Sequence, residues 1–469
     1  MRTHKEKLLI FRDDVINKTS GEVNESVLVS FVSRVDSINF DSILYLYQNK
    51  NNNYFYWSIP AENTSIFCAD SIFSISENGQ KRTEKTEEKF KKLQKNFHNN
   101  WAEYNLTSVP LIVGGMKFSA DDKNEIWRDY ADSEWRIPKN ILISNNDGNF
   151  LLTNFFISDS LEDILNSFQL GYELLTYNKT NGEQELKFYK VEEESPENEK
   201  ESWTEKVKSA LNKISKNEIQ KIVLSRKVQL RFESVPKLYK LLSKLSKDFP
   251  KCYIFAFKNN DSVFFGASPE KLAKISNGWI EADALAGSFP RGKDDAEDKK
   301  FEEELLNSKK NLAEQRAVVE FIEDSFKDFS DKIIYDQNPI IRKLSNIQHL
   351  WTPIKAKLNK EYTIFHLLKS IHPTPAICGA PWSIALSNIK QLENFERGLF
   401  AGITGWFNFD NEGEFAVSIR SALLNGKDLY AFAGCGIVEG SDPILEFEET
   451  ELKLKPILSL FENEKAYQP

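Results

Sequence analysis

The feature that most constrains the fold is a series of short strand-like segments, with helices grouped between them, that begins at Trp203. Each segment alternates apolar and polar residues or is apolar throughout, as expected of strands with one or both faces buried. The segments are KIVLSRKVQLRF (221–232), CYIFAFK (252–258), SVFFGAS (262–268), KLAKIS (271–276), GLFAGITGWFNF (398–409), EFAVSIRSALL (414–424) and DLYAFAGCGIV (428–438). Strands that follow one another directly in the sequence, with helices grouped between such runs, favour an α+β fold with antiparallel sheets over a regular βαβ alternation.

Other segments predict the remaining elements. Alternation predicts strands at 42–48 (SILYLYQ) and 52–60 (NNYFYWSIP). Helical spacing predicts helices within 81–104, over 204–219, along 300–329 and in the last segment, 446–461. The acidic, apolar-poor run 191–202 (VEEESPENEKES) is predicted to be a surface loop.

Charge and cysteine content exclude several classes of protein. With a net charge of −9, the chain lacks the overall basicity expected of a nucleic-acid-binding protein, so an anionic substrate requires a local basic pocket. The four cysteines are far apart and form no CxxC pair, which argues against a zinc cluster or a disulfide framework. Neither a signal-peptide core nor a membrane-spanning run is found. We therefore expect a cytoplasmic protein with no nucleic acid or membrane partner.

The last predicted helix carries a possible metal site. Glu446 and Glu449 are three residues apart and Lys453 follows four residues later, so all three lie on one helix face. Carboxylate pairs suit Mg²⁺, although a solvated acidic face is the commoner explanation of such spacing. Glu314, within the 300–329 helix, is an ordinary surface residue unless it faces Glu449 across a cleft.

Two further residues are candidates for proton transfer. Lys221 opens a strand, and a lysine enclosed in a pocket has a lowered pKa and can serve as a general base, whereas most lysines at strand ends are solvated. Glu270 follows Ser268 and Pro269, a pattern that also fits the start of a helix. If its carboxyl group is instead held protonated in a pocket, Glu270 can act as a general acid.

Small-residue segments and two polar side chains suggest where an anionic ligand would bind. The segments ALAGS (284–288), CGAP (378–381) and AGCGIVEGSDP (433–443) allow close backbone approach to a carboxylate. His372 and Arg420 are candidate donors, with a core histidine and a structural arginine as the default alternatives. The sequence contains no Walker A loop, no GxGxxG and no GxSxG, which disfavours a nucleotide cofactor and a serine nucleophile.

The order of these motifs resembles the chorismate-utilising enzyme family, which includes anthranilate synthase component I, aminodeoxychorismate synthase component I, salicylate synthase and isochorismate synthase. The resemblance is dense from Trp203 to the end and looser in the first 200 residues. The motifs are KIVLSRKV, FFGASPEKL, ALAGSFPRG, NLAEQR, IQHLWTPI, HPTPAICGAP, ERGLFAGITGW, VSIRSALL and AGCGIVEGSDPILEFEETELKLK.

The resemblance implies a fold, a cofactor and a set of roles. The fold would be a single unit over 1–469, with two large antiparallel sheets packed face to face and helices outside. It would comprise a variable half (1–200) and a motif-bearing half (203–463). Mg²⁺ would be the only cofactor, with Glu314 and Glu449 as ligands and Glu446 nearby. Lys221 would activate water and Glu270 would protonate the departing hydroxyl. The substrate would be bound by Ala286, Gly287, Ser288, His372, Arg420, Gly436 and Lys453.

Within the family, the segment around Ala286 is most similar to the isochorismate synthase branch. The aminodeoxychorismate branch has a nucleophilic lysine at that position, and no LLES-type inhibitor segment of the anthranilate branch is found. The branch implies no obligatory amidotransferase partner. Salicylate synthase, an ammonia-using anthranilate-type subunit and a non-catalytic scaffold are the alternatives. Gln315 stands where the family usually has histidine and Phe447 where it commonly has tryptophan, and both changes leave the charged residues in place.

Overall fold

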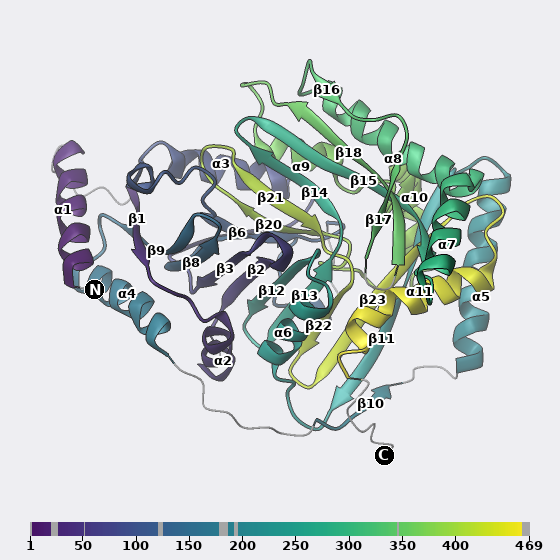
Figure 1. Cartoon of the computed structure of the whole chain (residues 1–469), viewed down its shortest axis with the longest axis horizontal. Coiled ribbons are helices and arrows are strands. Elements are labelled where there is room, and N and C mark those ends of the chain that lie inside the picture. The colour runs from purple at the N-terminus through teal and green to yellow at the C-terminus, as the bar shows by residue number, and fades with distance from the viewer. Residues whose placement is uncertain are drawn as a thin grey trace.

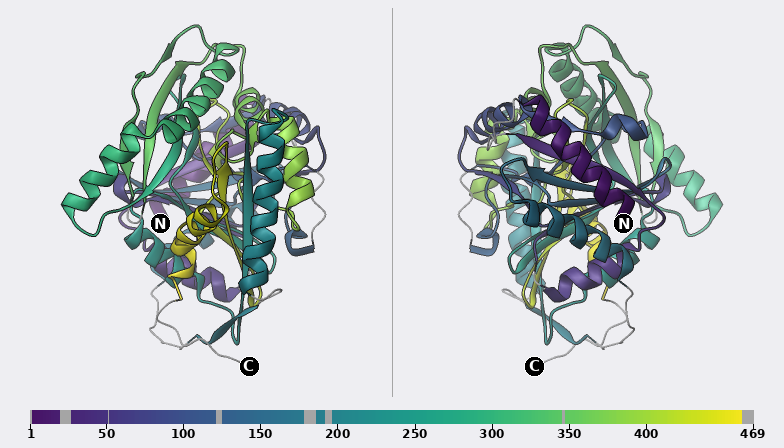
Figure 2. Two further views of the ribbon diagram at one scale, coloured as in Figure 1. Left: turned by 90° about the vertical axis from the view of Figure 1, so that its right-hand side faces the viewer. Right: turned by 90° about the vertical axis from the view of Figure 1, so that its left-hand side faces the viewer.

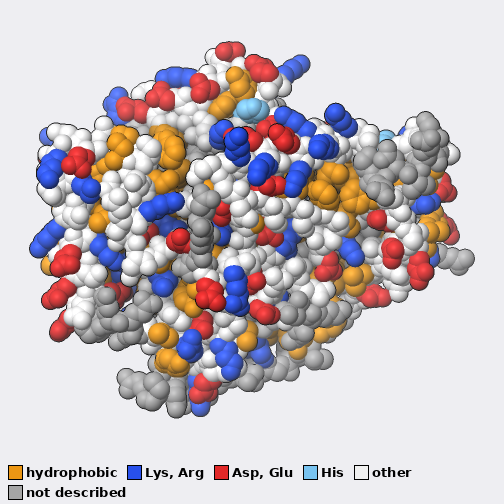
Figure 3. All heavy atoms as spheres, turned by 180° about the vertical axis from the view of Figure 1, so that it is seen from behind, with side chains coloured by type: hydrophobic (Ala, Val, Ile, Leu, Met, Phe, Trp, Pro, Cys, Tyr) orange, Lys and Arg blue, Asp and Glu red, His pale blue; other side chains and the backbone are white. Residues whose placement is uncertain are grey.

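The computed structural model describes residues 2–19, 27–50, 52–120, 125–177, 186–191, 196–344 and 347–461. Two large sheets with helices around them make up the architecture (Figure 1). No helix among the described residues is long and apolar enough to cross a membrane. On the face seen in Figure 3, acidic and basic side chains are interspersed, with no basic stripe.

The larger sheet contains thirteen strands within the described residues. All neighbours pair antiparallel except β1 and β5, which are parallel. In spatial order the strands are β10 (Phe188–Val191), β11 (Lys221–Phe232), β23 (Asp428–Ile437), β22 (Ser421–Asn425), β13 (Ser262–Ser268), β12 (Tyr253–Asn259), β2 (Tyr54–Ile59), β3 (Thr64–Ala69), β8 (Asn140–Asn145), β9 (Gly148–Phe156), β1 (Leu28–Val35) and β5 (Phe97–Asn99), with β19 (Gly379–Ala380) also on β11.

The smaller sheet contains ten strands in the same described ranges, and all of their pairings are antiparallel. In spatial order the strands are β16 (Ile333–Ile334), β18 (Ile347–Lys357), β15 (Trp279–Pro290), β14 (Lys271–Ser276), β21 (Gly413–Val417), β20 (Ile403–Phe407), β6 (Ile112–Met116), β7 (Ser133–Ile137) and β4 (Phe73–Glu77), with β17 (Ile340–Lys343) on β18. In both sheets, strands from the first 200 residues pair with later ones: β2 pairs with β12, and β6 pairs with β20.

Helices cover the outer faces and ends of the sheets (Figures 1 and 2). The α-helices are α1 (Arg2–Lys18), α2 (Phe40–Lys50), α3 (Arg82–Gln94), α4 (Leu161–Thr176), α5 (Pro196–Ser215), α6 (Leu238–Asp248), α7 (Asp295–Asn307), α8 (Lys309–Lys327), α9 (Ile364–Ile371), α10 (Trp382–Leu392) and α11 (Pro443–Leu458). The single-turn 3₁₀ helices are η1 (Pro60–Glu62), η2 (Trp101–Tyr104) and η3 (Glu125–Trp127). The C-terminal α11 lies beside α5, where the Trp203 indole donates to the Pro443 carbonyl at 3.0 Å.

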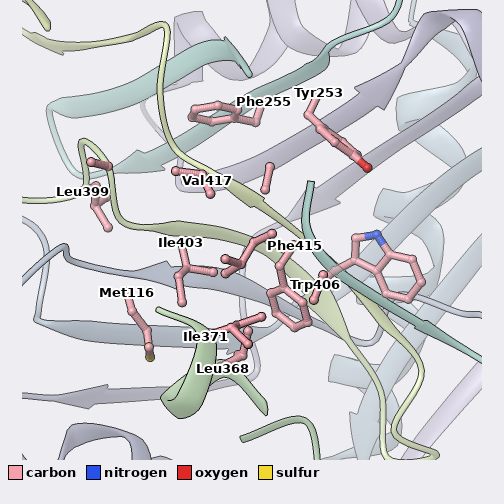
Figure 4. Packing of buried hydrophobic residues seen from close by; sticks show 14 of the residues in the cluster. Met116, Tyr253, Phe255, Leu368, Ile371, Leu399, Ile403, Trp406, Phe415 and Val417 are labelled. Atoms are coloured by element: carbon pink, nitrogen blue, oxygen red, sulfur yellow. The ribbon is translucent and has the colours of Figure 1, made fainter. Parts of the chain in front are cut away.

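The main hydrophobic core lies between the two sheets (Figure 4). It contains Phe255 from the larger sheet and Trp406, Phe415 and Val417 from the smaller one, all buried. Tyr253 of β12 spans the layers, because its hydroxyl donates to Glu414 of β21 at 3.0 Å. The core therefore holds the strands of the two sheets in fixed relation.

The structure corrects three predictions about individual elements. Residues 42–48 belong to helix α2 and are not a strand; the apolar run 43–47 fits either period, and burial of Ile43, Leu44 and Tyr47 follows the helical one. The predicted helix along 300–329 is two helices, because Ser308 ends α7 and caps α8. Within the predicted loop 191–202, residues 196–202 form the start of α5, while 192–195 lie outside the described residues.

Candidate active site

One cavity collects most of the predicted site residues. It lies where the first half of β11 and the end of β23 meet the irregular part of β15, flanked by α8 and α11. Its predicted members are Glu270, Ala286, Gly287, Ser288, Glu314, Arg420, Gly436, Glu449 and Lys453. Sequence segments more than 200 residues apart are therefore brought to a single pocket.

Lys221 adjoins this cavity as the first residue of β11. It is 4% exposed, and its ammonium group donates to Glu314 Oε1 at 2.7 Å. The backbone of Gly436 packs against this pair: a Cβ at that position would lie 2.7 Å from Lys221 Cε and 3.1 Å from Glu314 Oε1. Burial alone raises the pKa of Glu314, but the charge and hydrogen bond of Lys221 outweigh it, so the net pKa is lowered and Glu314 is ionised.

Glu270 lies between β13 and β14, so the alternative that it begins a helix is wrong. Its backbone N–H donates to the Ser268 hydroxyl at 3.2 Å, and its carbonyl accepts from Val417 N at 3.1 Å. Burial, followed by the charge of Asp283, raises the pKa of Glu270 to about 7. This carboxyl group can therefore carry a proton near neutral pH, as a general acid requires.

Helix α11 presents Glu449 and Lys453 to the same cavity. Glu449 Oε1 lies 2.6 Å from Lys453 Nζ, and Lys453 also donates to the Gly434 carbonyl at 3.1 Å. Glu446, 3% exposed, does not line the cavity but accepts from Lys310 at 3.1 Å. Burial lowers the pKa of Lys310, but Glu446, Glu314 and Glu449 together raise it above its usual value. All three predicted metal ligands are thus close to one lysine.

These carboxylates suit a hard cation. Among the described residues, no three or more His, Cys, Asp or Glu side chains converge tightly enough to form a metal cage. Mg²⁺ does not need such a cage, because it binds through one or two carboxylates and keeps waters or substrate oxygens as its other ligands. Glu314 and Glu449, both oxygen donors lining one cavity, fit that pattern. The assignment of Glu314, Glu449 and Glu446 to a metal stays a prediction.

Arg420, also in the cavity lining, offers a donor for an anion. Arg420 has φ of 51° and is 7% exposed, and its Nη1 is buried with no hydrogen-bond partner in the described structure. Burial lowers the pKa of Arg420 to about 10, so the group remains a cation. A buried cationic donor without a partner is the kind of group that a bound carboxylate satisfies. Gly287, with φ of 72°, shapes the adjoining wall where the β15 register shifts.

His372 and His349 are placed differently around the cavity. His372, predicted near the substrate, does not line the cavity; its Nε2 lies 3.0 Å from the carbonyl of Ala401, which does. His349 lines the cavity, with Nδ1 2.9 Å from Ser288 Oγ and a buried Nε2 that has no partner among the described residues. Burial, then Arg420 and Lys453, hold the pKa of His349 well below its usual value. His349 lies in the motif IQHLWTPI (347–354), but the sequence gave no reason to assign this histidine a role.

Sequence reasoning also missed Ser225 and Arg397, both in the cavity wall. For Ser225 a signal existed, since alternation placed it on the same strand face as Lys221.

The two departures from the family pattern, Gln315 and Phe447, are packing positions. Gln315 donates to Thr352 Oγ1 at 2.7 Å, and the Arg226 guanidinium lies 3.7 Å from the Phe447 ring centroid.

Comparison with known proteins gives consistent matches over nearly the whole chain. A family model described as chorismate binding enzyme matches residues 14–462. An isochorismate synthase of Bacillus subtilis is 31% identical, covering 97% of this chain and 98% of its own. The solved menaquinone-specific isochorismate synthase from Escherichia coli (TM-score 0.78, 23% identical) covers 97% of this chain and 100% of its own.

A third match is more distant in sequence. The solved anthranilate synthase component I from Streptococcus pneumoniae has a TM-score of 0.69 and 21% identity, covering 85% of this chain and 92% of its own. Together with the two-sheet architecture, the structural matches confirm the predicted fold class.

Proposed function

The chain belongs to the chorismate-binding enzyme family, and on that premise we propose that it is an isochorismate synthase. The proposed reaction is the Mg²⁺-dependent isomerisation of chorismate, in which water attacks C2 and the C4 hydroxyl departs. The observation that carries the proposal is the arrangement of Lys221 and Glu270 around one cavity that is also lined by Glu314, Glu449 and Arg420.

The proposed roles follow from the contacts of each side chain. In its neutral amine form, after losing the proton with which it pairs with Glu314 in the structure, Lys221 takes a proton from the attacking water, and Glu314 accepts a hydrogen bond that fixes the direction of the amine. Glu270 delivers its proton to the C4 oxygen, so the hydroxyl leaves as water and no charge accumulates on the ring. One proton is taken and one is given, in keeping with an isomerisation.

The substrate is a dianion, and the site contains groups to bind it. Arg420 and Lys453 supply fixed positive charge, and the backbone at Gly287 and Gly436 allows close approach of a carboxylate. Mg²⁺, when held by Glu314 and Glu449, would neutralise a substrate carboxylate and act as a Lewis acid. The buried, neutral His349 adds a polar group at the same wall.

Isomerisation is favoured over the neighbouring activities by the near full-length similarity to an isochorismate synthase. Ala286 in the cavity wall disfavours the aminodeoxychorismate branch, because it leaves no nucleophilic lysine at that position. A cytoplasmic location is proposed on the ground that all four cysteines are free and buried.

The proposal is tested by incubating purified protein with chorismate and Mg²⁺ and separating the products by chromatography. Isochorismate is expected with metal and is expected to be lost with a chelator. Lys221→Ala and Glu270→Gln should each abolish turnover, whereas the exposed-site controls Lys240→Ala and Glu448→Gln should not. Salicylate with pyruvate, or an aminated product with ammonium, would move the chain to a neighbouring branch. No turnover at all would favour the scaffold.

A further inference from the structure

A buried ion pair lies at the wall of the cavity. Arg397 and Glu393 are each 2% exposed at the side chain, and the pair is bidentate, with Nε to Oε2 at 2.9 Å and Nη2 to Oε1 at 2.6 Å. Arg397 lines the cavity, but Glu393 does not. Arginine–carboxylate forks of this kind fix geometry as well as charge.

The pair occupies a stretch along the outer edge of β11 with which none of the described strands pairs. At its start, β11 pairs with β19 at Lys221 and Ile222, and β10 joins only from Gln229 onward. Between these two partner strands, side chains form hydrogen bonds with the backbone of β11. Arg397 Nη2 donates to the Val223 carbonyl at 2.8 Å, and Ser225 N–H donates to Glu393 Oε1 at 2.8 Å. The ion pair thus makes the hydrogen bonds that a neighbouring strand would otherwise make.

Arg397 also ties this edge to the rest of the pocket wall. Its Nη1 donates to the Ile377 carbonyl at 2.8 Å, just before Cys378, whose carbonyl accepts from Val223 N–H at 2.9 Å. On the other side its guanidinium lies 4.4 Å from the ring centroid of Phe118, a residue of the first half of the chain. A single side chain therefore joins β11, the segment leading into β19 and the N-terminal half.

The strand that the pair holds carries two polar groups of the site. Lys221 lies two residues before Val223, whose carbonyl accepts the hydrogen bond from Arg397. Ser225 is held directly, through the hydrogen bond from its N–H to Glu393. Ser225 is 4% exposed and lines the cavity, and its hydroxyl has no hydrogen-bond partner among the described residues. A buried hydroxyl in that position is suited to a bound ligand or water.

We propose that Glu393 and Arg397 are positioning residues that fix β11, and with it Lys221 and Ser225, for the reaction. This inference rests on the proposed function. Neither residue reacts with the substrate: the pair sets where the amine of Lys221 and the hydroxyl of Ser225 lie. Displacing a reacting group by about 1 Å lowers turnover by about 100-fold.

The test uses Glu393→Gln and Arg397→Lys, each of which keeps part of the hydrogen bonding. The matched control is Arg231→Met, because Arg231 forms the same kind of fork with Asp428 at 2.6 and 2.8 Å on the far end of the same strand. We expect kcat to fall by about 100-fold in both test variants, with KM for chorismate within about threefold of wild type and the control unchanged. Glu393→Gln is the sharper variant, because Glu393 does not line the cavity.

Hydrogen–deuterium exchange supplies a readout that does not depend on turnover. The peptide covering 221–226 should exchange faster in both test variants than in wild type or in Arg231→Met, at a temperature where all four proteins are folded. If wild type forms no isochorismate yet this exchange pattern appears, the proposed function is wrong, but the role of Glu393 and Arg397 in fixing β11 is supported. The inference is overturned if exchange is unchanged, if kcat stays near that of the control, or if Arg397→Lys raises KM alone, which would make Arg397 a substrate-binding residue.

Discussion

Replacing Glu270 with glutamine should stabilise the folded protein while removing activity. The Glu270 side chain is buried, and its pKa is raised from 4.5 to about 7, first by burial and then by Asp283. Each unit of pKa shift corresponds to about 1.4 kcal/mol, so keeping this group ionised in the folded protein costs roughly 3 kcal/mol above pH 7. Glutamine has the same shape and no charge, so it avoids that cost.

The pH dependence has a definite sign. Because the folded pKa lies above the unfolded value, the folded protein holds a proton between pH 4.5 and about 7 that the unfolded chain has released. The free energy of unfolding of wild type therefore falls across that window relative to Glu270→Gln. The advantage of the variant should grow by about 2 kcal/mol between pH 5.5 and pH 8.5.

Urea unfolding at these two pH values, followed by tryptophan fluorescence, measures the difference directly. Glu448→Gln is the control, since Glu448 is exposed on α11 and its replacement should change stability little at either pH. If the difference between wild type and Glu270→Gln were the same at both pH values, Glu270 would not hold a raised pKa. Its assignment as the general acid would then lose its physical basis.

Three further predictions follow from the site. In a pH–rate study, kcat/KM should fall about tenfold per pH unit above about pH 7 as Glu270 ionises, and Asp283→Asn should move this limb to lower pH. Gly436→Ala should lower kcat by about tenfold or more with little change in melting temperature, because the added methyl group would press on Lys221 and Glu314. In calorimetric titration with Mg²⁺, Glu314→Gln and Glu449→Gln should each weaken binding, whereas Glu448→Gln should not.

The fold class could be predicted because strands adjacent in sequence pair with each other. The segments 252–258 and 262–268 became β12 and β13, an antiparallel hairpin, as alternation indicates. Pairing of β12 with β2, about 200 residues earlier, left no mark in either segment, since hydrogen-bonding partners are set by the whole sheet. The segment 42–48 shows the limit of periodicity, because the apolar run 43–47 within it fits helix and strand alike.

For the site, ordered motifs identified most of the cavity but could not show contacts. From sequence alone, Glu314 could be an ordinary surface residue and Glu449 part of a solvated acidic face; only the fold brings the two to one cavity. His372 was placed by its motif, yet it contacts Ala401 behind the wall, whereas His349 lines the cavity. Arg397 lay in the motif ERGLFAGITGW, but the motif gave it no role, because its contacts depend on an edge of β11 that exists only once the sheet has formed.

The most direct test of the proposed reaction is to run it in water enriched with heavy oxygen and to measure the mass of the products at short times. Attack by water at C2 with loss of the C4 hydroxyl predicts isochorismate that carries one heavy oxygen, formed only with Mg²⁺, while the remaining chorismate is still unlabelled. Unlabelled isochorismate would show that the original hydroxyl is retained, and the roles given to Lys221 and Glu270 would then be wrong.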